Sequence, residues 1–252
     1  IGGGHNNSLP LLSALAKNQQ QAVNCINLDP HADFRLLEGR HSGNGFSYAK
    51  AQGHLDSYLV MGLHELKNST AALQQLTAAG AGYCSYQRIF VRGELSYQQA
   101  LEQCIDFVVQ GQGDIGIEVD TDSISLMPVS AFTNCGISVQ SAEQFVYQLA
   151  RLPRSRYLHL AEAAPAQHPA GLSAGLNEAG QVLCALVFAF IQGKQHQAQA
   201  IFYSEEVTSE ERNVDKSLER AAFSKGIACE SFWQSTLYHI DDLPFPVKQT
   251  PE

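Results

Sequence analysis

The segment Asp29-Pro30-His31-Ala32-Asp33 constrains the fold of this chain more than any other, because three ligand-type side chains alternate along it. It directly follows an apolar stretch, residues 22–28, that predicts a buried strand. In an extended strand, residues two apart project to the same face, so a strand ending here would aim two carboxylates and one imidazole at one point. Crowded carboxylates repel each other and resist burial unless a cation neutralises them. The segment therefore predicts a divalent metal site at the end of a strand.

Strand-like and helix-like segments alternate along the first 192 residues. The predicted strands are residues 22–28, 59–63, 88–91, 115–122 and 157–161, and the predicted helices are residues 8–17, 69–79, 96–110, 141–152 and 178–192. Residues 36–49, rich in glycine and serine, predict an ordered loop. The alternation predicts an α/β fold with three layers, in which helices flank a mainly parallel central sheet. Such sheets place their ligands at the carboxyl ends of the strands.

Further metal-ligand candidates fall at the ends of other predicted strands. Asp120 and Asp122 end the strand 115–122, Glu162 follows the strand 157–161, and His5 follows three glycines. Each has a plain alternative: His5 as a turn residue, Asp120 and Asp122 as a helix cap, and Glu162 as an acid at a helix N-terminus. With the segment 29–33, the aspartates and histidines amount to four carboxylates and two imidazoles. This set exceeds the need of one ion and suits two ions about 3.5–4 Å apart. Oxygen-rich ligation without thiolates favours Mn²⁺ over Zn²⁺.

Composition narrows the class of protein. The 252 residues are 44% hydrophobic, which is enough for a sizeable core. A net charge of −9 with only 16% charged residues predicts no nucleic-acid partner. The longest apolar run, residues 182–191, is shorter than the ~20 residues that span a membrane, which predicts no membrane partner. The six cysteines lack CxxC pairing and predict reduced thiols in a cytoplasmic protein.

The order of these motifs resembles the ureohydrolase superfamily, which contains arginases, agmatinases and formimidoylglutamases. The matching motifs are Gly2-Gly3-Gly4-His5, Asp29-Pro30-His31-Ala32-Asp33, Asp120-Thr121-Asp122 and Glu162-Ala163-Ala164-Pro165. The resemblance covers about residues 1–192. It implies an arginase-like α/β fold, and a homo-oligomer is expected because the superfamily commonly forms trimers or larger rings.

The chain is expected to form one arginase-like domain, residues 1–252, with a core of about residues 1–192. A glycine-rich turn normally follows a strand, so the opening at Ile1 predicts that the N-terminal part of the domain is missing. Residues 193–252 are expected to form an extension for packing or oligomerisation. A weak strand is predicted at residues 198–206, a charged helix at 210–222, a second strand at 232–240 and a frayed proline-containing tail.

The resemblance also implies roles for the motif residues. One Mn²⁺ would be held by His5, Asp29, Asp33 and Asp120, and a second by Asp29, His31, Asp120 and Asp122, with Asp29 and Asp120 bridging. A hydroxide between the two ions would attack the carbon of an amidine or guanidine substrate. Asp33 would carry a proton to the leaving nitrogen, and Glu162 would pair with the cationic substrate. Ser42 and Asn44 would bind the carboxylate of an amino-acid substrate, although the segment 42–44 is equally compatible with a simple turn.

Departures from the common motifs favour the formimidoylglutamase branch over arginase. Gly4 replaces a common aspartate, no histidine follows closely after residues 42–44, Glu118 stands where a small polar residue is common, and Ser123-Ile124-Ser125 lacks the usual Asp-Pro. The predicted reaction converts N-formimidoyl-L-glutamate and water to L-glutamate and formamide. Arg88 is either a contact to the distal substrate carboxylate or a structural residue. The alternatives are another guanidino- or amidino-acid hydrolase of the agmatinase or arginase type, and an inactive member that binds a metabolite.

Overall fold

The computed structural model describes residues 1–194, 200–205, 216, 218–220, 222–224, 226 and 228–233. The chain divides into two compact units, residues 2–198 and residues 199–252 together with Ile1. The division falls close to residue 192, where the sequence places the end of the arginase-like core. All six predicted metal ligands and Glu162 belong to the larger unit.

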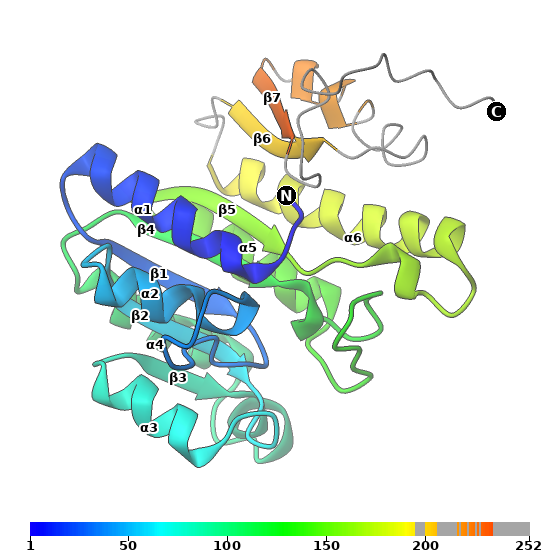
Figure 1. The fold of residues 1–252 in the computed structure, drawn as a ribbon. Helices are drawn as coiled ribbons and strands as arrows, with labels where there is room; N and C mark the ends of the chain where they lie inside the picture. The colour runs from blue at the N-terminus through cyan, green and yellow to red at the C-terminus, as the bar shows by residue number, and fades with distance from the viewer. Residues whose placement is uncertain are drawn as a thin grey trace. The chain divides into compact units, whose positions relative to one another are not determined.

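The larger unit is built on one parallel sheet of five strands, β1 Val23–Leu28, β2 Leu55–Leu63, β3 Gly82–Ser85, β4 Ile115–Asp120 and β5 Ser155–Ala161. Their order is β3-β2-β1-β4-β5, and every pairing is parallel (Figure 1). The chain runs outward from β1 through β2 to β3 and then returns to place β4 on the other side of β1. Strand order therefore reverses between β1 and β4, and the crevice at the carboxyl ends of such a strand pair is where open α/β sheets bind ligands.

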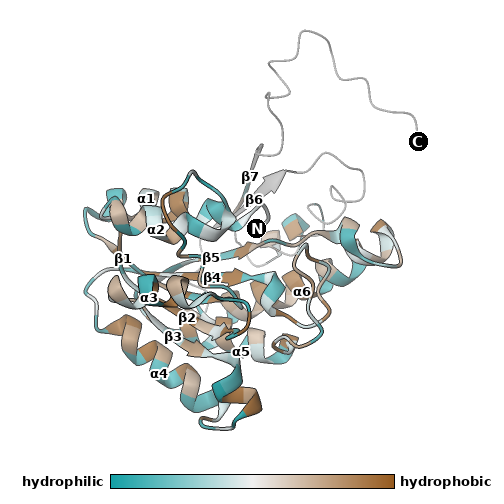
Figure 2. Ribbon diagram, turned by 60° about the horizontal axis from the view of Figure 1, so that its bottom comes forward, coloured by the Kyte–Doolittle hydropathy of each residue, from teal (hydrophilic) through white to brown (hydrophobic). Residues whose placement is uncertain are grey.

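Six α-helices flank the sheet: α1 Ser8–Gln19, α2 Gly45–Ala51, α3 Thr70–Ala78, α4 Tyr97–Val109, α5 Val139–Ala150 and α6 Leu172–Gly193. Helices α1 and α2 pack together on one face, and α4 and α5 cover the opposite face (Figure 1). Figure 2 shows hydrophobic positions along the central strands and mixed positions along the flanking helices. All residues of β1 and β4 are buried, as expected for central strands of a parallel sheet. The predicted three-layer, mainly parallel fold is confirmed.

Two predicted elements of the larger unit are wrong. The loop predicted at residues 36–49 ends earlier, because helix α2 begins at Gly45 and places buried Phe46 and Ala49 on the side that faces the core. The strand predicted at residues 88–91 is a π-helical turn, Gln87–Val91, in which the Arg92 N–H donates to the carbonyl oxygen of Gln87. The strand before it, β3, is short and lies at the sheet edge, so its sequence carries only a weak apolar pattern.

The smaller unit contains two parallel strands, β6 Ala200–Glu205 and β7 Ala228–Trp233, paired from Ala200 opposite Ala228. The described residues 216, 218–220, 222 and 223, which lie between these strands in the chain, are helical. The strand predicted at residues 198–206 and part of the helix predicted at 210–222 are therefore present. The second strand lies earlier than the predicted residues 232–240. Residues 206–215 and 234–252, including the predicted tail, lie outside the described residues.

Within the described residues, α6 is long and apolar enough to cross a membrane by length and composition, and 33% of its most apolar window is buried. It is longer than the run 182–191 because it begins at Leu172. One such helix is weak evidence for a membrane span, and α6 packs on α5. All six cysteines are free; Cys25, Cys84 and Cys104 are buried, and Cys135 and Cys184 are exposed.

Candidate metal centre

A glycine loop carries His5 to the carboxyl end of β5. Gly2 and Gly3 adopt positive φ angles of 94° and 75°, which glycine reaches without steric cost. The Gly2 N–H donates to the carbonyl oxygen of Leu160, and the Glu162 N–H donates to that of Gly3. The His5 N–H then donates to Glu162 Oε1 at 2.7 Å, and the His5 ring is fully buried. These hydrogen bonds hold residues 2–5 beside the carboxyl end of β5.

Asp29, His31 and Asp33 converge through a turn and not through strand alternation, which corrects the sequence-based explanation. Strand β1 ends at Leu28, before the first of them. Asp29 Oδ1 accepts a hydrogen bond of 2.7 Å from the His31 N–H, and Asp33 has a φ of 45°, in the left-handed region. Aspartate favours such turns because its side chain bonds to the backbone two residues on. The three side chains still meet at one end of the sheet.

Asp120 is the last residue of β4, and Asp122 lies in the turn that follows it. Asp120 Oδ1 accepts from the Asp122 N–H at 2.9 Å and caps the 3-10 turn Thr121–Ser123. The Thr121 hydroxyl donates to the carbonyl oxygen of Ala161 at 2.7 Å, which ties this turn to β5. Asp120 Oδ2 lies 3.2 Å from His5 Nδ1. Asp120 therefore caps the turn, which is the structural alternative given for it above, and its other oxygen faces His5.

The six side chains form two groups that share Asp29. His5 Nδ1 lies 2.9 Å from an oxygen of Asp33, 3.2 Å from Asp120 and 3.3 Å from Asp29. His31 Nδ1 lies 3.2 Å from Asp122 and 3.5 Å from the other oxygen of Asp29. Ligand atoms held about 2.1 Å from one ion lie about 3 Å apart, which matches these separations. The first group has the membership expected for one ion. The second contains three of the four residues expected for the other ion, because Asp120 is grouped only with the first.

The buried atoms of this cluster fit a cation. Among the described residues, His5 Nδ1 and Asp122 Oδ1 are buried polar atoms without a hydrogen-bond partner. Leaving such an atom unsatisfied costs about 1–3 kcal/mol, more for a charged group. All donors in the set are carboxylate oxygens or imidazole nitrogens, the ligand types that Mn²⁺ takes.

Without a cation, protons neutralise the cluster. Burial and the charge of Asp29 raise the pKa of Asp33 to about 7 and also raise the pKa of Asp120. Burial opposes protonation of His31, but its hydrogen bonds to Asp122 and Asp29 raise the pKa of His31 to about 11. A divalent cation must displace these protons, so Mn²⁺ affinity should increase with pH.

We expect the metal-free protein to lose stability as the pH rises from about 5 to about 8. The folded state keeps the Asp33 proton up to about pH 7 and the His31 proton up to about pH 11, whereas their ordinary pKa values are 3.8 and 6.5. The folded state therefore binds more protons than the unfolded state across this window, and the free energy of unfolding falls as the pH increases.

Thermal melts across this pH range, with and without Mn²⁺, would measure the effect. Because the ion replaces the protons and binds only the folded state, we expect Mn²⁺ to raise Tm most at the upper end of the range. A metal-free Tm that stayed constant or rose with pH, or a Tm that chelation left unchanged, would contradict this description of the cluster.

A cavity of about 520 Å³ opens beside the cluster. Its wall includes Asp33, Asp120, Asp122 and Glu162, and it also includes the cationic side chains of Arg35 and Lys67. Arg35 lies 3.0 Å from Glu38 in an exposed ion pair. The cavity is therefore lined by acidic side chains of the cluster and also by two cationic side chains.

Of the two residues predicted to bind a substrate carboxylate, the structure places one at the cavity. Ser42 lines it together with Gly43. Asn44 is fully buried, accepts from the His41 N–H at 3.0 Å and donates to the carbonyl oxygens of Gly39 and Leu36. The amide of Asn44 therefore holds the loop together, because both its acceptor and its donor are used there, and its predicted contact with the substrate stays a prediction.

Arg88 is also away from the cavity wall. It belongs to the π-helical turn and forms an ion pair of 2.9 Å with Glu94. Of the two readings that the sequence allows, this placement agrees with the structural one.

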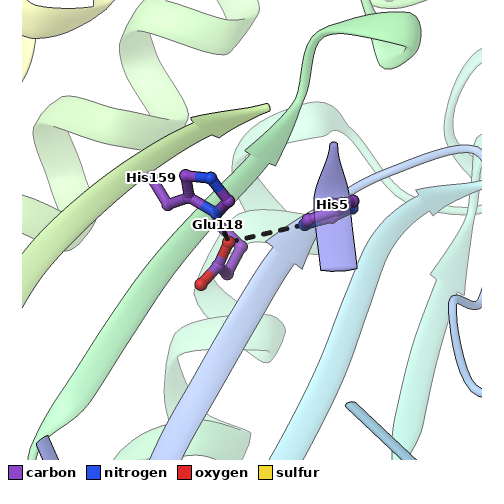
Figure 3. Close-up of side chains that lie close together, drawn as sticks. All are labelled: His5, Glu118 and His159. Atoms are coloured by element: carbon purple, nitrogen blue, oxygen red, sulfur yellow. Dashed lines mark hydrogen bonds and ion pairs between the residues drawn. The ribbon is translucent and has the colours of Figure 1, made fainter. Parts of the chain in front are cut away.

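The structure adds buried residues that the sequence pattern did not indicate as parts of the site. Glu118 on β4 and His159 on β5 lie opposite each other in register and beside His5 (Figure 3). Asn27 donates to Asp29 Oδ2 at 2.9 Å. A carboxylate at position 118 in an otherwise apolar strand is a signal in the sequence, but its partner can be named only once the strand order is known.

A family model described as "Arginase family" matches residues 1–189, and one described as "DNA photolyase" matches residues 177–252. A formimidoylglutamase of Macrococcus caseolyticus is 27% identical over 175 residues, covering 66% of this chain and 52% of that protein. A cryptochrome DASH of Synechocystis is 41% identical over 59 residues, covering 23% of this chain and 12% of that protein. The chain thus spans about half the length of the formimidoylglutamase that it matches and a small part of the cryptochrome.

Solved structures agree with the fold. The formimidoylglutamase of Bacillus subtilis has a TM-score of 0.66 at 18% identity, covering 76% of this chain and 59% of that chain. The formiminoglutamase of Trypanosoma cruzi crystallised with Mn²⁺ has a TM-score of 0.64 at 20% identity, covering 76% of this chain and 63% of that chain. The likeness to these structures shows that the larger unit has the arginase-like fold.

Proposed function

We propose, because the chain belongs to the arginase family, that it is a manganese-dependent hydrolase of a C–N bond in a linear amidine. The observation that carries the proposal is the cluster at the ends of β1 and β4, in which Asp29 joins two metal-binding groups. The proposed ligands are His5, Asp29, His31, Asp33, Asp120 and Asp122, for two Mn²⁺ ions per chain. When bound, these ions would lower the pKa of water and supply the nucleophile near neutral pH.

Asp33 is suited to move a proton during the reaction. Its carboxyl group lines the cavity, and one of its oxygens lies 2.9 Å from Nδ1 of His5 in the proposed metal site. A carboxylate that borders both the metal site and the cavity can accept a proton on one side and return it on the other. We therefore assign Asp33 the transfer of a proton to the leaving nitrogen of the substrate.

Glu162 is suited to hold the cationic end of the substrate. It lines the cavity, and the backbone N–H of His5 fixes its Oε1 at 2.7 Å. Its φ of 65° is a strained conformation for a residue with a side chain, of the kind that persists where the surroundings enforce it. A carboxylate held in this way can accept charge-assisted hydrogen bonds from an amidinium group.

The cavity wall favours a substrate with negative charge at its other end. Arg35 and Lys67 line the cavity, and Ser42 and Gly43 add polar groups. N-formimidoyl-L-glutamate carries two carboxylates besides its amidine, whereas arginine carries one and agmatine carries none. We therefore propose N-formimidoyl-L-glutamate as the substrate, with L-glutamate and formamide as products, a choice also supported by the similarity to formimidoylglutamases.

Steady-state assays of the Mn²⁺-loaded full-length chain on formimidoylglutamate, arginine and agmatine test this choice. We expect formamide release from formimidoylglutamate with a kcat/KM at least about 100-fold above that for the other two, since a mismatched charge pair costs several kcal/mol. Faster turnover of arginine or agmatine would contradict the choice of substrate. Two bound ions without turnover of any of the three would favour an inactive, metabolite-binding protein.

We also propose that the protein works in the cytoplasm. Cys135 and Cys184 are free and exposed, which suits the reducing cytoplasm. We also propose a homo-oligomer acting on small molecules, and light scattering on the purified full-length chain would measure its mass.

A further inference from the structure

A second cluster of ionisable side chains lies directly behind the metal-site candidates. Glu118 is fully buried, and its Oε1 accepts from the Tyr157 hydroxyl at 2.7 Å. Its Oε2 lies 2.5 Å from His159 Nδ1 and 3.4 Å from His5 Nε2 (Figure 3). Glu118 therefore stands between a histidine of the metal site and a histidine outside it.

Distances decide whether this cluster is a third metal site or a support for the proposed one. Two ligands about 2.1 Å from one ion are about 3 Å apart, as in the groups around Asp29. Glu118 and His159 are closer than that, at 2.5 Å, which is the distance of a short charge-assisted hydrogen bond. The pair is therefore bonded directly, and Glu118 Oε2 faces His5 from a position that is already fixed.

The two nitrogens of the His5 ring have different surroundings. Nδ1 faces carboxylate oxygens of Asp29, Asp33 and Asp120, whereas Nε2 faces the carboxylate of Glu118. Neither nitrogen has a hydrogen-bond partner with good geometry among the described residues. Two rings pack against the His5 ring: Phe46, nearly perpendicular at a centroid distance of 5.2 Å, and His159, tilted at 5.9 Å. A metal-binding histidine generally donates its other N–H to a carboxylate, which fixes its tautomer and its orientation.

We propose that Glu118 is a positioning residue for the metal site: it accepts the Nε2–H of His5 and so leaves the Nδ1 lone pair free for the ion that His5, Asp29, Asp33 and Asp120 would hold. Tyr157 and His159 hold Glu118 in place. This inference rests on the metal site of the proposed function.

Manganese titration of the full-length chain, followed by the electron paramagnetic resonance signal of free Mn²⁺, tests the proposal. Glu118→Gln keeps the size of the side chain but removes its charge and one acceptor oxygen. We expect one of the two ions, the one near His5, to bind about 10–100-fold more weakly, as is typical when such a supporting partner is lost. The other ion should keep its affinity within about threefold, because His31 and Asp122 do not contact Glu118.

Asp114→Asn is the matched control. Asp114 directly precedes β4 and forms an ion pair with the half-exposed Arg156, so its loss removes the same charge next to the same strand without touching His5. Both affinities should then match those of the parent protein. A gentler variant, Tyr157→Phe, removes only one support of Glu118 and should weaken the same ion by a smaller factor.

Each outcome bears on the proposal. Unchanged affinities in a folded Glu118→Gln variant, or equal weakening of both ions, would overturn it. If circular dichroism shows that Glu118→Gln does not fold, Tyr157→Phe decides: selective weakening of one ion supports the proposal, and unchanged binding contradicts it. A third ion in the parent that is lost in His159→Gln would assign the cluster to metal binding instead. A parent that binds no Mn²⁺ would defeat the proposed function itself, which distinguishes the two failures.

Discussion

Replacement of Asp29 by Asn is expected to remove manganese from the protein and to abolish turnover. Asp29 is the residue common to both groups: one oxygen lies 3.3 Å from His5 Nδ1 and the other 3.5 Å from His31 Nδ1. Loss of a supporting partner alone typically weakens metal binding about 10–100-fold, so loss of a shared ligand should weaken both ions by more than about 100-fold. Both effects can be followed by elemental analysis and by formamide release.

Asp106→Asn is the control for this variant, because Asp106 is exposed on α4 and its replacement changes the charge equally. The control should bind manganese and turn over substrate like the parent. An Asp29→Asn protein that kept two ions would contradict the shared role of this carboxylate. If that protein also kept its binding of a metabolite, the binding alternative would gain support.

Replacement of Glu162 by Gln is expected to lower kcat/KM by about 100-fold while the manganese content stays unchanged. The glutamine oxygen can still accept from the His5 N–H, which Glu162 Oε1 accepts at 2.7 Å, so the glycine loop should keep its place. The variant loses the charge that pairs with the amidinium group, and charge-assisted hydrogen bonds contribute roughly 1.5–3 kcal/mol each.

Steady-state kinetics and a metal count on the same preparation would separate these effects. Glu102→Gln on the exposed side of α4 is the matched control and should have parent activity. A Glu162→Gln variant with parent kcat/KM would contradict the assignment of Glu162 to the substrate. Loss of metal together with activity would instead indicate that Glu162 acts mainly through the position of His5.

The central sheet could be predicted from the sequence because buried parallel strands are continuous apolar runs, as in β1 and β4. Edge strand β3 lacks such a run. The sequence pattern instead predicts a strand at residues 88–91, where the structure has a π-helical turn. Helix α2 was predicted as loop because glycine and serine conceal the helical spacing of Phe46 and Ala49. The hydrophobic pattern is weakest in such short elements, since four residues in β3 and seven in α2 span too few positions to display a clear period.

The candidate ligands could be predicted because acidic and imidazole side chains stand at strand ends, but the way in which they converge could not. Asp29 and Asp120 each bond to the backbone two residues on, so turns bring the side chains together. The structural role of Asn44 and the pairing of Glu118 with His159 depend on contacts between distant segments. Such contacts follow from strand order and loop packing, which a single sequence does not display.

The structure of the C-terminal unit is also only partly predictable from the sequence. The sequence suggested two strands and a helix there, and β6 and β7 are parallel partners. The similarity of residues 177–252 to the DNA photolyase family model does not follow from that pattern, because two strands and a helix are common to many families. The expected role of this extension in packing or oligomerisation stays a prediction.

The most direct test of the proposed metal centre is the number of Mn²⁺ ions that the full-length protein retains after equilibrium dialysis at neutral pH. Two groups of ligand atoms that share Asp29 predict about two ions per chain. Elemental analysis together with the protein concentration gives this number. Retention of no manganese, even from a medium in excess of the metal, would contradict the binuclear site on which the proposed hydrolysis depends.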